Sequence, residues 1–164
     1  MADVFVSIGS NINRDHNIRG GLNALREHFG EITLSPVYES LSVGFDGENF
    51  YNLAASFQTN LTIDELGELF DQIEDAYGRD RNSPRFSART LDIDLLLYDR
   101  VVSKNHCILP RPEIYENAFV LKPLADIAGN LTDPLKDKTY QQLWREFQGG
   151  EKQELWEINI DLNP

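Results

Sequence analysis

The sequence predicts an α+β fold of the ferredoxin-like type: a β-α-β-β-α-β antiparallel sheet with helices packed on it, followed by C-terminal additions. Apolar runs of strand length and segments with helical spacing follow one another in that order. No repeat, low-complexity tract or linker divides the 164 residues, so we expect one domain over residues 1–164. In such folds the helices lie mainly on one face of the sheet.

The first half of the chain supplies three strands and one helix. A helix is capped by Asn13 or Asp15 and ended by Gly30, because these residue types favour helix ends. Its apolar positions keep helical spacing, at Ile18, Leu22, Leu25 and Phe29. The predicted strands are residues 4–9, 32–38 and 50–59, with a glycine-containing loop at 39–48.

The second half begins with a clear helix signal. Thr62 and Glu65 form a capping-box pattern, and Gly78 closes the helix that follows. The core face of this helix is Ile63, Leu66, Phe70, Ile73 and Tyr77. The remaining expected elements are a strand at 90–98, an irregular segment with two prolines, and helices at 119–128 and 139–147. The tail alternates in part, which predicts a strand with one apolar side that is covered: Trp156, Ile158, Ile160 and Leu162.

The charge distribution limits the ligands. The net charge of −12 disfavours nucleic acid, because most of the surface would repel a polyanion. Arginines nevertheless gather in one stretch, at Arg79, Arg81, Arg85, Arg89 and Arg100. A compact cationic cluster on an acidic protein suits a small anionic ligand. The alternative is that these arginines only pair with surface carboxylates.

The composition also bears on the compartment. The single cysteine, Cys107, excludes an internal disulfide and any multi-cysteine zinc site. No apolar run approaches the ~20 residues of a membrane span, and the first residues lack the features of a signal peptide. By elimination we expect a cytoplasmic protein. Its expected partners are small molecules, without a membrane or nucleic acid, and we expect a monomer.

The most informative stretch contains Asp92 and Asp94. Residues two apart in a strand share a face, with Cα atoms roughly 6–7 Å apart, so both carboxylates point the same way. The opposite, core face would carry Leu91, Ile93, Leu95 and Leu97. Paired carboxylates repel each other unless a cation lies between them, and two aspartates that leave room for water and phosphate oxygens suit Mg²⁺. Two such ions would clamp a phosphoryl displacement. The alternative is a solvated strand face without a ligand.

Other positions are less specific when taken alone. The position of Glu74 favours solvent, Phe50 and Phe119 favour the core, and Asn52 needs a hydrogen-bond partner if it is buried. No phosphate-binding glycine loop and no nucleophilic serine motif is present. His16, His28 and His106 are too scattered to form a metal cluster.

From about residue 4 to 128 the chain resembles the 6-hydroxymethyl-7,8-dihydropterin pyrophosphokinases of folate biosynthesis; residues 129–164 extend beyond the resemblance. The segments that carry it are Ser7-Ile-Gly-Ser-Asn11, Phe50-Tyr-Asn52, Gly78-Arg79-x-Arg81, Arg89-Thr-Leu-Asp-Ile-Asp94 and Ala118-Phe-Val-Leu-x-Pro-Leu124. Their combination in this order is far more specific than Asp-x-Asp alone.

The resemblance implies a Mg²⁺-dependent kinase that transfers the terminal diphosphate of ATP to the pterin hydroxymethyl group and leaves AMP. It implies two Mg²⁺ ions on Asp92 and Asp94, with ATP as co-substrate. The implied catalytic residues are Arg79, Arg89, Asp92 and Asp94. The implied pterin-binding residues are Ser40, Val43, Phe50, Asn52 and Phe119. The implied nucleotide-binding residues are Glu74, Arg81, Arg89, Ile93 and Arg111.

Several positions depart from the pattern of the family. They are Phe86-Ser-Ala88 in place of Trp-Gly-Pro, His106 at a position often basic, Arg111 in place of histidine, and Asn117 in place of arginine. These changes motivate a second hypothesis, a diverged paralogue with weak or altered catalysis that binds pterin. A nucleotidyl or glycosyl transferase using Asp-x-Asp lacks its other motifs here.

Overall fold

The computed structural model describes residues 1–41, 48–78, 90–147 and 153–163. Within these residues, six strands form one sheet in the order β5-β1-β4-β3-β6, with β2 also beside β4, and all pairs are antiparallel. The strands are β1 (Ala2–Ser10), β2 (Thr33–Leu34), β3 (Val37–Ser40), β4 (Phe50–Thr59), β5 (Asp92–Tyr98) and β6 (Leu155–Ile158). The helices are α1 (Arg14–Phe29), α2 (Ile63–Ala76), α3 (Glu113–Glu116), α4 (Ala118–Ala128) and α5 (Tyr140–Arg145). The predicted ferredoxin-like order is confirmed.

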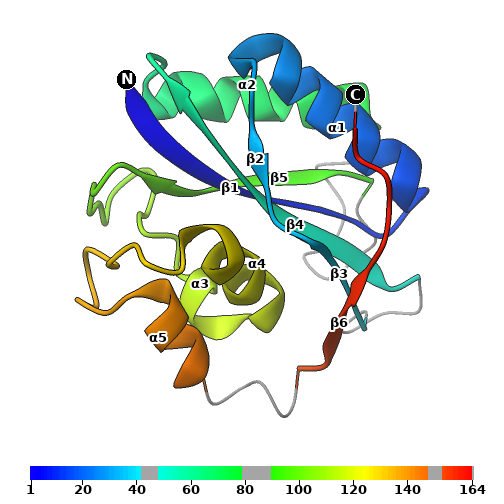
Figure 1. Cartoon of the computed structure of the whole chain (residues 1–164). Helices are drawn as coiled ribbons and strands as arrows, with labels where there is room; N and C mark the ends of the chain where they lie inside the picture. The colour runs from blue at the N-terminus through cyan, green and yellow to red at the C-terminus, as the bar shows by residue number, and fades with distance from the viewer. Residues whose placement is uncertain (42–47, 79–89, 148–152, 164) are drawn as a thin grey trace.

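Helices cover both faces of the sheet. Helices α1 and α2 lie on one face, and α3, α4 and α5 lie on the other (Figure 1). Each face has its own cluster of buried apolar side chains. The expectation that helices lie mainly on one face is therefore wrong, because the C-terminal helices cover a second apolar surface. We call the face that carries α1 and α2 the first face, and the face that carries α3–α5 the second face.

A β-bulge in β5 creates part of that second apolar surface. Val6 pairs with Leu95 and Phe5 pairs with Leu97, which leaves Leu96 as an extra residue. Leu96 and Leu97 therefore both pack in the second-face cluster, whereas Leu95 packs in the first. The expectation that Leu97 shares a face with Leu95 is wrong, because the extra residue reverses the alternation.

The predicted second strand is split in two. Ser35 donates its N–H to the Ala54 carbonyl at 2.9 Å, and its hydroxyl accepts the Ala54 N–H at 2.8 Å. Pro36, which follows, has no N–H to give to a sheet ladder. Both short strands still pair with β4, which brings Tyr38 opposite Asn52.

The helix signals are largely confirmed. The capping box is present, with Glu65 N–H donating to the Thr62 hydroxyl at 3.1 Å and Thr62 N–H donating to the Glu65 carboxylate at 2.9 Å. Asn13 occupies the N-cap position of α1 in a left-handed conformation and makes no side-chain capping bond. Gly30 and Gly78 adopt positive φ angles after the two long helices, as their residue type favours.

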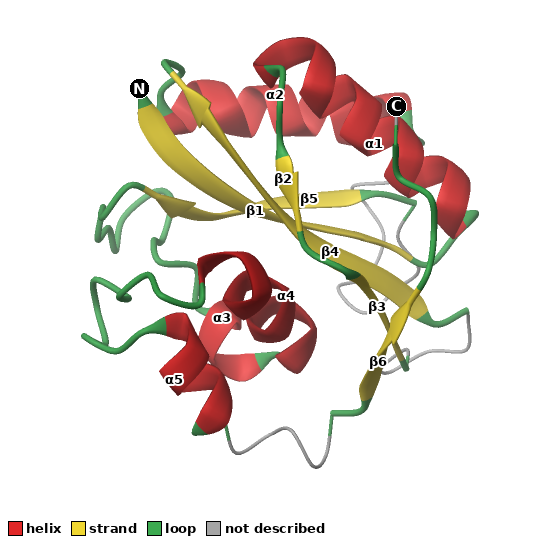
Figure 2. Ribbon diagram, viewed as in Figure 1, coloured by secondary structure: helices red, strands yellow, loops and turns green. Residues whose placement is uncertain are grey.

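The tail adds a strand to the sheet edge. Strand β6 pairs with β3 (Figure 2), and Ile158, Ile160 and Leu162 pack against the first-face cluster. The cover is partial, since Trp156 is 40% exposed. In the described parts of the chain, no helix is both long enough and apolar enough to cross a membrane.

Candidate active site

The sheet register aligns four residues in one row across four strands. Asp92 lies opposite Gly9, Gly9 lies opposite Asn52, and Asn52 lies opposite Tyr38. All four positions belong to the second face, since their sequence neighbours Ile8, Leu53 and Ile93 pack in the first-face cluster. Asp92 and Asn52 are two strands apart, about 10 Å along the row. Asp94 lies two residues after Asp92 in β5, opposite Ser7, and therefore on the same face.

Gly9 makes room for Asn52. A Cβ atom at residue 9 would overlap Asn52 Oδ1. Asn52 is only 5% exposed, and its Nδ2 is buried without a hydrogen-bond partner among the described residues. A buried amide donor without an acceptor destabilises the fold by about 1–3 kcal/mol, so such a group calls for an acceptor from water, an ion or a ligand.

Two aromatic side chains lie on elements next to this row. Phe50 begins β4, two residues before Asn52, and is paired with the buried Ser40 of β3. Phe119 comes from the first turn of α4 and packs beside the second-face cluster. Both rings are half-buried.

A hydrogen bond from Tyr38 of β3 to Asp126 of α4 connects helix α4 to the same part of the sheet. The Tyr38 hydroxyl donates to Asp126 Oδ2, and the Lys122 ammonium donates to Asp126 Oδ1 at 2.7 Å. Burial and the neighbouring Asp126 carboxylate both raise the pKa of Tyr38. The phenol therefore remains a donor, and it fixes the helix that carries Phe119.

A groove of about 520 Å³ runs along the outer edge of β5, between α2 and the segment with His106, Cys107 and Arg111. Glu74 lies at its base, only 4% exposed, and accepts the Ile93 N–H at 2.8 Å. The expectation that Glu74 faces solvent is wrong, because β5 is an edge strand whose outward N–H needs an acceptor. Ile93 also lines the groove, with its side chain almost fully buried.

Arg111 joins the groove to the aspartate pair. Its Nη2 lies 3.5 Å from Asp94 Oδ1, and its Nε contacts the Glu113 carboxylate. Burial lowers the pKa of Arg111, but Asp94 and Glu113 outweigh it and leave the pKa above its ordinary value. Glu113 lies in a segment that the sequence leaves irregular and that forms the short helix α3.

Cys107 and His106 also line the groove. Burial raises the pKa of the Cys107 thiol, so it stays protonated near neutral pH. His106 is exposed, as expected, and lies 3.7 Å from Asp64. Several candidate residues lie outside the described residues, namely Val43, Arg79, Arg81, Phe86 and Arg89.

The sequence model of the 7,8-dihydro-6-hydroxymethylpterin-pyrophosphokinase (HPPK) family matches residues 5–129. The chain belongs to this family. It is 34% identical over 154 residues to the 2-amino-4-hydroxy-6-hydroxymethyldihydropteridine pyrophosphokinase of Bacillus subtilis, covering 88% of this chain and 92% of that protein. A protein of the same name from Aquifex aeolicus is 31% identical and covers 87% of this chain and 90% of its own length.

Other relatives of the HPPK chain are longer proteins. The folate synthesis bifunctional protein of Arabidopsis thaliana is 34% identical over 77% of this chain, which spans 27% of that protein. Among solved structures, a Plasmodium falciparum HPPK-DHPS triple mutant superposes with a TM-score of 0.73 at 12% identity. The match covers 99% of this chain and 45% of the other, and supports the HPPK fold alone.

The aspartate pair of this HPPK chain fits a hard cation. The described residues contain no group of three or more His, Cys, Asp or Glu side chains placed to hold one ion. Asp92 and Asp94 are both partly exposed, lie on one face and offer only oxygen. Mg²⁺ is commonly held by one or two carboxylates together with water and phosphate oxygens, so this donor set suits it.

Proposed function

We propose that the protein transfers the terminal diphosphate of ATP to the hydroxymethyl oxygen of 6-hydroxymethyl-7,8-dihydropterin and releases AMP, as a step of folate biosynthesis. One observation carries the proposal: a single sheet face holds both the Asp92–Asp94 pair and the buried Asn52, whose Nδ2 has no hydrogen-bond partner among the described residues. Family membership supports the same reaction.

Asn52 and its neighbours form the pterin side. The Nδ2 of Asn52 donates to an acceptor on the pterin edge, which supplies the bond that this buried group lacks. Gly9 leaves room for this amide beside β1, because it has no Cβ. Phe50 and Phe119 stack on the pterin ring from β4 and α4, and Ser40 with Val43 completes this wall.

The two aspartates have different neighbours and therefore different roles. Asp92 shares its row with Asn52 and faces the pterin hydroxymethyl group. Asp94 borders the β5 groove and contacts Arg111, so it faces the nucleotide. Bound at this pair, two Mg²⁺ ions would neutralise the phosphate oxygens during transfer.

The β5 groove is the nucleotide side. Among the described residues, its charged side chains are mostly carboxylates, and Arg111 contributes a positive charge. An ATP polyanion therefore needs further positive charge, which Mg²⁺ and the arginines at 79, 81 and 89 supply. The pterin hydroxyl oxygen bonds to the β-phosphorus, the hydroxyl proton is released, and the bond from that phosphorus to the α–β bridging oxygen breaks.

The test is AMP release from ATP with 6-hydroxymethyl-7,8-dihydropterin, with and without Mg²⁺, and with the Bacillus subtilis relative as a positive control. We expect AMP only when pterin and Mg²⁺ are both present. Asp94→Ala should abolish turnover and leave pterin binding within a few-fold of the wild type. Pterin binding without nucleotide binding or AMP release would instead support the pterin-binding paralogue.

A further inference from the structure

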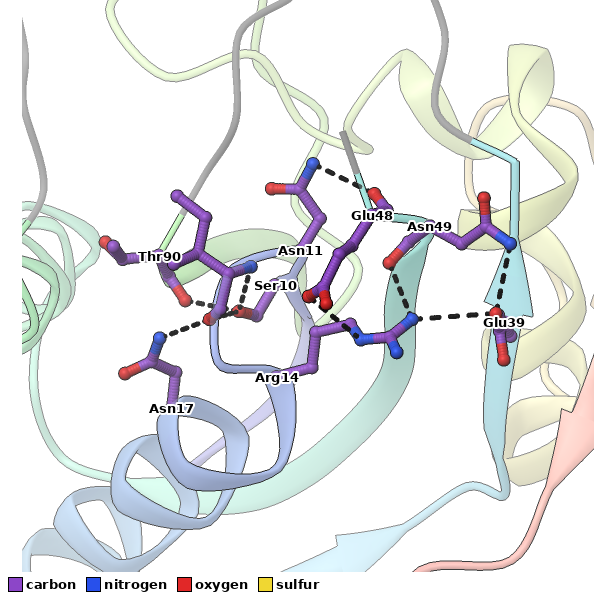
Figure 3. A network of polar contacts seen from close by, with 9 residues as sticks. Ser10, Asn11, Arg14, Asn17, Glu39, Glu48, Asn49 and Thr90 are labelled. Carbon is purple, nitrogen blue, oxygen red and sulfur yellow. Dashed lines mark hydrogen bonds and ion pairs between the residues drawn. The ribbon is translucent and has the colours of Figure 1, made fainter. Parts of the chain in front are cut away.

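The side chain of Arg14 contacts Glu39, Glu48 and Asn49, which come from β3 and from the segment before β4 (Figure 3). Arg14 is the first residue of α1, and its guanidinium carbon lies 3.9 Å from the centre of the Tyr51 ring. Its Nη1 donates to the Asn49 carbonyl at 3.0 Å and lies 3.5 Å from Glu39 Oε2. Its Nε lies 3.7 Å from Glu48 Oε2.

The partners of Arg14 alternate with the proposed pterin wall. Glu39 is paired with Tyr51 across β3 and β4, and Tyr51 packs beside the first-face cluster. Because adjacent residues in a strand point to opposite faces, the next residues, Ser40 and Asn52, point to the second face. The Asn49 amide also donates to Glu39 Oε2 at 3.0 Å, which closes a ring of contacts around the strand ends. Movement of Glu39 or Asn49 would therefore shift Ser40 or Phe50.

This network differs from an ordinary surface ion pair. The side chains of Arg14 and Glu39 are 21% and 20% exposed, so the pair is largely removed from water. The planar guanidinium also stacks on an aromatic ring, an interaction that Lys reproduces poorly. By comparison, Lys138 and Glu146 form an exposed pair, with side chains 45% and 50% accessible. Such exposed pairs contribute little.

We propose that Arg14 is a positioning residue for the pterin side of the site, acting through Glu39, Asn49 and Tyr51 without touching substrate. This inference rests on the proposed function, because it takes Ser40, Phe50 and Asn52 as the pterin wall. We expect Arg14 to affect pterin affinity and not ATP use. Its partners lie on β3, on β4 and directly before β4, and not along β5.

The test measures pterin binding by calorimetry and steady-state kinetics for Arg14→Met, Arg14→Lys and Glu39→Gln, with Lys138→Met as the matched control. Arg14→Met should raise the KM and the Kd for 6-hydroxymethyl-7,8-dihydropterin about ten-fold, with the KM for ATP within two-fold of the wild type. Arg14→Lys should recover part of this loss, and Lys138→Met should change none of these values. In Arg14→Met/Glu39→Gln the increases should be less than multiplicative.

Equal changes in both KM values, or an unchanged pterin Kd in Arg14→Met, would overturn the role of Arg14. If Arg14→Met does not fold, Arg14→Lys and Glu39→Gln decide the question by the same split. A wild-type protein that binds pterin but releases no AMP would refute the proposed function, while the pterin Kd of the variants would still test Arg14. Absence of any pterin binding by the wild type would refute both.

Discussion

The carboxylate of Glu74 accepts the backbone N–H of Ile93 at 2.8 Å, so a buried acid on α2 completes the outer edge of β5. Ile93 lies between the two aspartates of the proposed metal site. The Glu74 contact therefore fixes the strand that sets the direction of both carboxylates, and Glu74 also lines the groove along β5.

Glu74→Ala should lower the free energy of unfolding by about 1–3 kcal/mol, because it leaves a buried N–H without an acceptor. Glu74→Gln keeps a carbonyl oxygen that can accept this N–H, so it should lower the free energy of unfolding by less. Urea denaturation checks both, with Glu68→Ala on the exposed side of α2 as the control for removing a helix carboxylate. A similar, small loss in all three variants would show that the contact contributes little.

Gly9→Ala should lower stability by about 1–3 kcal/mol and weaken pterin binding, because the new Cβ overlaps the Asn52 amide. Asn52→Ala alone should weaken pterin binding with a smaller loss of stability, since it removes an amide whose Nδ2 has no partner in the described part of the chain. The double variant Gly9→Ala/Asn52→Ala separates the two effects. It should be more stable than Gly9→Ala, as measured by thermal unfolding. If the double variant is no more stable, the overlap with Asn52 is not the cause of the loss in Gly9→Ala.

The features that the sequence predicts correctly follow from short-range rules. The capping box of Thr62 and Glu65 needs only residues within one helical turn. The common direction of Asp92 and Asp94 needs only the alternation of a strand, which stays regular up to Leu95. The order of the elements then determines the ferredoxin-like plan.

The features that the sequence does not predict depend on partners far along the chain. The bulge at Leu96 is visible only in the register with β1, so Leu97 is placed on the wrong face. The burial of Glu74 depends on β5 being an edge strand. Arg14 gives no local signal, because its contacts to Glu39 and Asn49 lie 25 or more residues away.

Arg111 should keep its charge across the physiological range. Burial lowers the pKa of Arg111, but the carboxylates of Asp94 and Glu113 more than compensate and raise it. The ion pair with Asp94 is therefore fully present below the ordinary arginine pKa and is lost only at more alkaline pH. The ion pair should therefore cause no pH dependence of stability or affinity near pH 7.

Arg111→His should introduce a pH dependence that the wild type lacks, because histidine loses its charge as the pH rises through about 6.5. We expect the ratio of the ATP KM of Arg111→His to that of the wild type to rise at least about three-fold between about pH 6 and 8. Arg111→Lys stays charged and is the control, with a flat ratio. If the ratio depends on pH in the same way for the histidine and lysine variants, the charge at this position does not affect the KM for ATP.

Asp133 is a fully buried carboxylate that contacts helices α3 and α5. It accepts the hydroxyls of Tyr115 and Tyr140, both at 2.7 Å, and the N–H groups of Leu135 and Lys136. Burial, followed by the Asp133 carboxylate, raises the pKa of both tyrosines above the ordinary value of 10.0. Their neutral forms are therefore favoured by folding.

The sign of the alkaline effect follows from these raised pKa values. The stabilisation is complete below about pH 10 and is lost as the pH rises further, because only the unfolded chain releases these protons readily. Tyr140→Phe should reduce stability near pH 7 by about 1–3 kcal/mol, since the buried Asp133 carboxylate loses one of its two hydroxyl donors. It should also flatten the decline above about pH 10. Urea denaturation at a series of pH values measures both effects; an unchanged alkaline slope would show that the Tyr140 proton is not coupled to folding.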